Sequence, residues 1–434
     1  MGSQALRELA IATGFCQRSS KLPPEVFFDL MFYSVSLSHN SSLESLVSYL
    51  KKRYGIQIRK QSLDDRFSEK TLNFVKAVLK RLFSEQFSGM LFTGDFLCQY
   101  NHVRIKDSTT FKVPNNLVNQ YKGRSGTAVI TIQYEFDLKT GKFLDLTLTQ
   151  AVRNDQSDAQ ETAENICKND LIIRDLGYFS TGAFKKIDKA EAHFLSRLQA
   201  ATAVYDENNV EIDFKKQHAF MTKNGIEKCE RQVFIGKNKL PVRLVIGLVP
   251  VRVYEQRIRS KDKEEKHRGY QMKDRTKFLL HFNLFVTNVD AKKLPLEKIM
   301  PLYRFRWQVE LMFKNWKSVF SIHKLQKMKE KRYITMLYIR LILIIVNLQI
   351  TNQVQCVLSK QGEKDAVLSY RKTLQTLKNS FSDMLRILRG AREQAIKLLG
   401  EIYQILSKNH WREKRKNREN FIDNICLFIC KSEI

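Results

Sequence analysis

Three acidic residues in this chain stand in settings where carboxylates could bind metal ions. Asp107 closes a stretch of alternating polar and apolar residues and Asp175 closes a short apolar stretch, and both patterns predict strands. Glu310 lies in residues 303–317, which predict a single helix because no Gly or Pro interrupts them and Pro301 stands just ahead. Carboxylates on two strand ends and on a facing helix can share divalent cations, which prefer oxygen ligands.

The predicted helix places charged and apolar side chains on adjoining faces. At about 100° per residue, one arc of about 60° collects an acid, two cations and a phenol, namely Tyr303, Arg306, Glu310 and Lys317. The adjoining arc is apolar and suits a core; it contains Phe305, Val309, Met312, Phe313, Trp316 and Phe320. A simpler interpretation is open, because Arg306 and Glu310 are four residues apart and such pairs often only solubilise a helix. Spacing alone favours the simpler interpretation.

A resemblance to a known family favours a functional role for these residues over the simpler interpretation. The spacing Y-x2-R-x3-E-x6-K, which is read at Tyr303, Arg306, Glu310 and Lys317, resembles the signature of bacterial insertion-sequence transposases of the DDE class. In that family the Glu is the third metal-binding carboxylate. The settings of Asp107 and Asp175 resemble those of the first and second. The resemblance implies that these three acids bind Mg²⁺, for which Mn²⁺ can substitute, and that they catalyse DNA strand cleavage.

The chemistry explains why acids are needed. Cutting a phosphodiester with water or a DNA 3′-hydroxyl requires charge neutralisation on the entering and leaving oxygens, which two divalent cations about 3.5–4 Å apart provide. Either Asp alone would be interpreted as a turn or cap residue. Asp95 and Asp170 are the nearest rivals, but Asp95 precedes its predicted strand and Asp170 begins one, so both are expected to point away from the site.

The same resemblance implies roles in binding DNA. Arg306 and Lys317 are expected to clamp phosphates near the cut, and Tyr303 to donate a hydrogen bond to another phosphate. Trp307 falls outside the apolar arc and could stack on a base or sugar, although a packed Trp is the commoner outcome.

Charge and composition restrict the partners. The 434 residues include 74 Lys and Arg against 45 Asp and Glu, a net charge of +29. Such an excess indicates a polyanion, most simply nucleic acid, with an anionic membrane surface as the competing partner. The resemblance implies that this nucleic acid is double-stranded DNA. No membrane anchor is expected, because the longest mostly apolar run, 341–348, is far shorter than the roughly 20 residues of a spanning helix. Seven scattered cysteines fit a reducing cytoplasm.

The order of the patterns predicts an α+β or α/β fold with a ribonuclease H-like mixed-sheet core. Residues 1–90 should be a helical DNA-binding region, although a plain helical bundle with a basic face fits equally well. The core should occupy 91–198 and 291–350, the second part carrying the signature helix. A β-rich insertion should occupy 199–290, with 257–277 as an exposed loop or hairpin tip, and 351–434 should form a helical, basic C-terminal region.

Together these features predict a cut-and-paste DNA transposase of the bacterial nucleoid. It would bind terminal inverted repeats, cleave DNA with two metal ions and transfer the 3′ ends to target DNA. The family implies a homodimer on DNA. A two-metal nuclease or resolvase without strand transfer is one alternative. A non-catalytic DNA-binding protein derived from a transposase is another.

Overall fold

A computed structural model of the protein describes residues 2–17, 20–36, 42–86, 95–123, 126–152, 155–360, 368–379 and 392–411. The chain divides into two compact units, which are described in turn. The first unit is built from residues 1–93, 109–152 and 310–430. The second is built mainly from residues 94–108 and 153–309.

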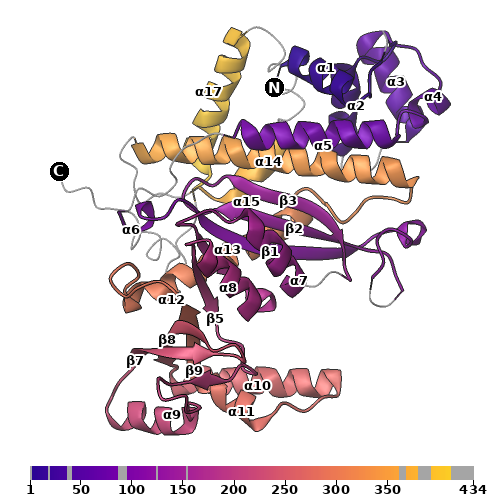
Figure 1. Ribbon diagram of the computed structural model, residues 1–434. Coiled ribbons are helices and arrows are strands. Elements are labelled where there is room, and N and C mark those ends of the chain that lie inside the picture. Colours follow the sequence, from indigo (N-terminus) through magenta and orange to yellow (C-terminus); the bar gives the residue numbers. More distant parts are fainter. Residues whose placement is uncertain are drawn as a thin grey trace. The chain divides into compact units, whose positions relative to one another are not determined.

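The described strands form one mixed sheet of nine (Figure 1). Along the chain they are β1 (Val103–Lys112), β2 (Val129–Asp137), β3 (Phe143–Gln150), β4 (Leu171–Arg174), β5 (His193–Arg197), β6 (Val204–Tyr205), β7 (Lys228–Ile235), β8 (Leu240–Leu248) and β9 (Phe282–Thr287). Their order in the sheet is β3-β2-β1-β4-β5-β9-β8-β7-β6. Strands β1, β4 and β5 are parallel neighbours, whereas β2 with β3 and β5 with β9 are antiparallel. The mixed-sheet core predicted from the sequence is confirmed.

The first unit is mainly helical. Its helices are α1 (Ser3–Ala12), α2 (Pro24–Ser36), α3 (Leu43–Tyr54), α4 (Lys60–Asp64), α5 (Glu69–Ser84), η1 (Asn115–Leu117), the later part of α13 (Arg306–Ser318), α14 (Glu330–Lys360), α15 (Tyr370–Asn379) and α17 (Arg392–Asn409). Helix α14 packs on α2, α5, α15 and α17, and α5 lies along it (Figure 1). Helix α13 packs its apolar face on β2, because the buried Tyr134 ring contacts Phe313 at 5.8 Å and Trp316 at 5.2 Å.

Helix α14 is more apolar than the sequence analysis allowed. Its stretch Glu330–Leu358 is long and apolar enough to cross a membrane, which a count of the longest uninterrupted run had missed. However, 83% of the most apolar window is buried inside the protein. It therefore has the character of a core helix, and as evidence for a membrane span it is weak.

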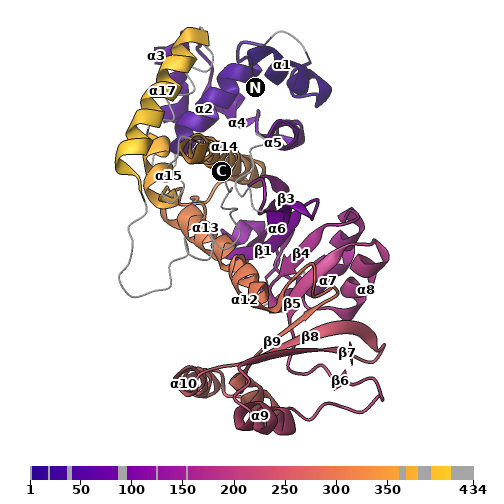
Figure 2. The same cartoon turned by 90° about the vertical axis from the view of Figure 1, so that its left-hand side faces the viewer.

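The second unit surrounds its strands with short helices. They are α6 (Asp95–Cys98), α7 (Asp155–Glu161), η2 (Thr162–Asn165), η3 (Leu176–Tyr178), α8 (Thr181–Lys189), α9 (Phe214–Lys223), α10 (Val251–Arg268), α11 (Asp274–Phe278), η4 (Leu279–His281) and α12 (Leu296–Arg304). Figure 2 shows α9 and α10 on one side of the strands β7 to β9.

The segment 257–277 is not the exposed loop or hairpin tip that its alternating charges predicted. It contains most of α10 and most of α11. Pairs of opposite charge one turn apart support the helix, including Arg259 with Glu255 and Arg268 with Glu264. Helix α10 ends at Gly269, whose φ of 66° suits a left-handed cap. None of the residues of α10 is buried. The charges therefore predicted the exposure of this segment correctly, but not its helical conformation.

The predicted single helix over 303–317 is two helices. Pro301 lies inside α12, and α13 begins at Arg306. Between them the Phe305 amide donates to the Leu302 carbonyl, a tighter turn than an α-helix makes. Tyr303 therefore belongs to the end of α12, but its ring still lies beside Arg306, whose guanidinium carbon is 6.0 Å from the ring centroid.

Candidate active site

The two predicted catalytic aspartates are brought together by strand register. Strands β1 and β4 are parallel and pair Lys106 with Arg174, so Asp107 and Asp175 each follow one member of this pair. Strand β1 does not end at Asp107, as the sequence suggested, but continues to Lys112. It is the pairing with β4 that stops there. Both aspartates consequently lie just beyond the end of the parallel pairing, next to each other.

A cation already stands beside both carboxylates. The Arg306 guanidinium places Nη1 3.7 Å from Asp107 Oδ2 and Nε 3.3 Å from Asp175 Oδ1. The Asp107 and Arg306 side chains are 16% and 17% exposed, and Asp175 is 43% exposed. One positively charged group can therefore face both aspartates from a position that solvent reaches. Two carboxylates that face one cationic group can also face a divalent cation, whose preferred ligands are oxygens.

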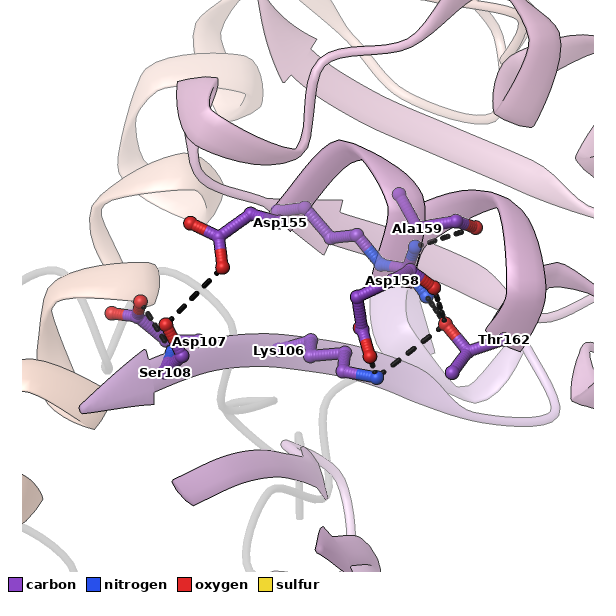
Figure 3. A network of polar contacts seen from close by, with 8 residues as sticks. Lys106, Asp107, Ser108, Asp155, Asp158, Ala159 and Thr162 are labelled. Atoms are coloured by element: carbon purple, nitrogen blue, oxygen red, sulfur yellow. Dashed lines mark hydrogen bonds and ion pairs between the residues drawn. The ribbon is translucent and has the colours of Figure 1, made fainter. Parts of the chain in front are cut away.

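The Asp107 carboxylate is held by one of its oxygens. The Ser108 amide donates to Asp107 Oδ1 at 2.8 Å, and Figure 3 shows this contact beside the Ser108 side chain. The other oxygen, Oδ2, is the one nearest Arg306. One oxygen is thus fixed by the backbone while the other faces the cation.

Glu310 lies on α13, four residues and about one helical turn after Arg306, and is half-buried. Glu310 is the first residue of the segment 310–430, which belongs to the first unit. In the described part of the chain, no three His, Cys, Asp or Glu side chains lie close enough to hold a metal ion as they stand. The structure therefore brings Asp107 and Asp175 together around Arg306, and the third ligand stays a prediction.

The predicted DNA-binding residues have different surroundings. Tyr303 is buried, and its hydroxyl donates to the Arg174 carbonyl at 3.3 Å. Burial raises the pKa of Tyr303 to about 12, and the nearby Asp175 charge adds to the rise, so the hydroxyl keeps its proton. Lys317 Nζ donates to the Thr110 carbonyl at 3.3 Å, and burial lowers the pKa of this ammonium. Trp307 is 44% exposed, in keeping with its place outside the apolar arc.

The apolar arc itself is confirmed. Phe305, Val309, Phe313, Trp316 and Phe320 are all buried, and Met312 is half-buried with its sulfur 3.5 Å from the Tyr134 hydroxyl.

A buried charged layer lies on the other face of β1 and β4, and the sequence analysis missed it. Lys106 Nζ is 2.6 Å from Asp158 Oδ2, with side chains 0% and 2% exposed. Arg104 pairs with Asp170 at 3.1 Å, so Asp170 has a structural role, as its place before the strand indicated. The available signal was the alternation in β1, which puts Arg104, Lys106 and Ser108 on the face opposite Asp107.

Comparisons with known proteins give the family of the chain. The family model described as Transposase DDE domain matches residues 101–348, more than half of the chain. The transposase for insertion sequence element IS231B of Bacillus thuringiensis subsp. berliner is 28% identical over 438 residues, covering 96% of this chain and 91% of that relative. The IS231C transposase of the same subspecies is 27% identical over 441 residues with the same coverage.

A more distant relative has the same description. The transposase for insertion sequence element IS1151 of Clostridium perfringens is 25% identical over 380 residues, covering 83% of this chain and 80% of that protein. The family match includes Asp107, Asp175 and all of α13. This chain belongs to the DDE transposase family of insertion-sequence elements.

Proposed function

We propose that the protein binds the terminal inverted repeats of its own element, cleaves them with two divalent metal ions and transfers the 3′ ends to target DNA. The observation that carries the proposal is the pair Asp107 and Asp175 facing one cationic group at the end of a parallel strand pair. Family membership and a net charge of +29 support DNA as the substrate.

Asp107, Asp175 and Glu310 are the proposed metal ligands, with Mg²⁺ as the natural ion and Mn²⁺ as a substitute. When bound, the metal ions neutralise charge on the attacking and leaving oxygens of the phosphodiester. The chain's own contribution is orientation. The Ser108 amide fixes one oxygen of Asp107, and strand register fixes Asp107 relative to Asp175. The carboxylates would act as metal ligands and not as nucleophiles, and the attacking group would be water or a DNA 3′-hydroxyl.

The basic residues of α13 are the proposed phosphate ligands. Arg306 faces two carboxylates and Lys317 faces a carbonyl, so each must exchange a contact within the protein for one with DNA. Tyr303 would contribute a hydroxyl to another phosphate, and Trp307, exposed at the start of α13, would stack on a base or sugar.

The remaining assignments follow from charge and from the family. Residues 1–90 would bind the ends, 91–198 and 291–350 would form the catalytic core, and 199–290 would be its insertion. Residues 351–434 would be a helical, basic C-terminal region, of which 361–367, 380–391 and 412–434 lie outside the described residues. The protein would act as a homodimer that pairs two ends in the bacterial cytoplasm, on the nucleoid.

Strand transfer separates this proposal from its alternatives. With pre-cut transposon ends, the protein should join the 3′ ends to a target plasmid in Mg²⁺, and end binding should weaken steeply as salt rises because phosphate contacts release counterions. Cleavage of uncut ends without joining would instead indicate a nuclease or resolvase. Salt-sensitive binding with neither reaction would indicate a non-catalytic DNA-binding protein. A flat salt response would argue against DNA as the partner.

Replacing Arg306 with Ala should change metal binding and cleavage in opposite directions. Removal of the competing guanidinium should tighten Mn²⁺ binding to the DNA-free protein by about fivefold, because two partly exposed ion pairs contribute roughly 1 kcal/mol. Strand cleavage should fall, because a phosphate contact is lost. Electron paramagnetic resonance of free Mn²⁺ measures the first effect and a gel cleavage assay the second.

The matched control is Arg304→Ala, which removes an exposed Arg two residues earlier. It should change neither the affinity for Mn²⁺ nor the rate of strand cleavage. Weaker Mn²⁺ binding in Arg306→Ala would mean that Arg306 supports the metal site instead of competing for it.

A further inference from the structure

Helix α7 and the residue after Asp107 suggest how the Asp107 carboxylate is held in place. We propose that Asp155 and Ser108 are positioning residues, which orient the Asp107 carboxylate for metal binding through a chain of two hydrogen bonds. The inference rests on the proposed function, since it assumes that Asp107 is a metal ligand.

Ser108 makes two bonds in different directions. Its amide donates to Asp107 Oδ1 at 2.8 Å, and its hydroxyl donates to Asp155 Oδ1 at 3.2 Å (Figure 3). Because the hydroxyl is anchored on one side of the strand, the Ser108 peptide group resists rotation. That peptide supplies the bond which fixes Asp107.

Asp155 touches the segments that follow both aspartates. Besides Ser108, it approaches Gly177, two residues after Asp175, where an added Cβ would lie 3.0 Å from Asp155 Oδ2. The turn after β4 therefore packs directly on this carboxylate. A single side chain is in contact with the residue after Asp107 and with the turn after Asp175.

Asp155 is itself held by a rigid support. It begins α7, and the next turn of this segment is tied to the sheet by the buried pair between Lys106 and Asp158. The Thr162 hydroxyl adds contacts of 3.4 Å to Lys106 Nζ and to Arg174 Nη2. Lys106 and Arg174 are the residues directly before the two aspartates, so α7 and η2 connect β1 to β4 on the face opposite the metal ligands.

Outer contacts of this kind matter because a metal ligand must be presented in one orientation. Losing such a partner typically weakens metal binding or activity by about 10- to 100-fold. Any residue at position 108 except Pro could donate its backbone N–H to the Asp107 carboxylate. The hydrogen bond to Asp155, however, requires a side-chain hydroxyl. The carboxylate charge of Asp155 is not needed, because an amide oxygen can also accept from Ser108.

The test compares removal with conservative replacement. We expect Asp155→Ala and Ser108→Ala to weaken Mn²⁺ binding to the DNA-free protein by about tenfold, and to raise the Mn²⁺ concentration for half-maximal cleavage similarly. Asp155→Asn and Ser108→Thr, which keep an acceptor and a hydroxyl, should stay within about threefold of the unaltered protein. Binding of transposon ends in Ca²⁺ should be the same for all four variants.

Asp213→Ala is the matched control, because Asp213 caps the remote helix α9 and its loss is a comparable local change. It should leave Mn²⁺ binding unaltered. The inference is overturned if Asp155→Ala and Ser108→Ala bind Mn²⁺ normally, or if Asp155→Asn is as weak as Asp155→Ala. Asp107→Asn distinguishes failure of the proposed metal site from failure of the proposed positioning roles. If this variant also binds Mn²⁺ normally, the proposed metal site fails; if only the Asp155 variants do, the inference alone fails.

Discussion

Replacing Asp107 or Asp175 with Asn is expected to reduce strand cleavage by about a thousandfold or more. Asn keeps the size of the side chain and an oxygen that can accept from the Ser108 amide, but it removes the charge that attracts a divalent ion. Metal ions contribute several kcal/mol to transition-state stabilisation in such reactions, and about 4 kcal/mol corresponds to this factor. Single-turnover cleavage of labelled transposon ends is the measurement.

Two further measurements make this result specific. End binding in Ca²⁺, measured by gel shift, should change by less than about threefold, because the aspartates are expected to contact metal ions and not base edges. Asp274→Asn removes an exposed acid at the start of α11 and should leave cleavage unchanged. Persistent cleavage in both Asp107→Asn and Asp175→Asn, with normal end binding, would show that the catalytic acids are elsewhere.

The second large effect is on stability. Replacing Asp158 with Ala is expected to lower the free energy of unfolding by about 3–5 kcal/mol, because it leaves the Lys106 ammonium buried without its carboxylate. Urea denaturation followed by circular dichroism measures the loss as a lower midpoint.

A double variant tests the cause. Lys106→Met combined with Asp158→Leu removes both charges and fills the space with apolar groups, which should restore most of the lost stability. The matched control is Lys168→Ala. Its pair with Glu191 has the same 2.6 Å separation, but the side chains are 71% and 68% exposed, so little change is expected. If the double variant is as unstable as Asp158→Ala, packing and not charge accounts for the loss.

Sequence patterns predicted the strands at this site because they are local. Alternation at 102–107 and the apolar run at 171–174 are visible without any tertiary information, and β1 and β4 are found there. The apolar arc of α13 was equally visible, because helical spacing alone puts Phe313 and Trp316 on one face. What could not be read was the register that sets Lys106 opposite Arg174, since it depends on pairing between segments about 70 residues apart.

The failures have identifiable physical causes. The alternating charges of α10 were interpreted as a loop, although the same residues form pairs one turn apart. The break after α12 depends on one backbone turn at Phe305, for which no residue in the sequence is a signal. Asp158 was overlooked because an acid in a polar stretch usually faces solvent, and only its contact with Lys106 marks it as buried.

The packing of the long helix α14 limits which segments of the chain can be deleted. The buried apolar residues of α2 and α5, among them Phe27, Phe74 and Val78, belong to helices that pack on a segment some 250 residues further along the chain. A fragment ending after α5 would expose the faces of α2 and α5 that pack on α14 and would tend to aggregate, and a fragment lacking α1 to α5 would expose the corresponding faces of α14. The chain's beginning is therefore not a detachable recognition module, and truncation is a poor way to study it.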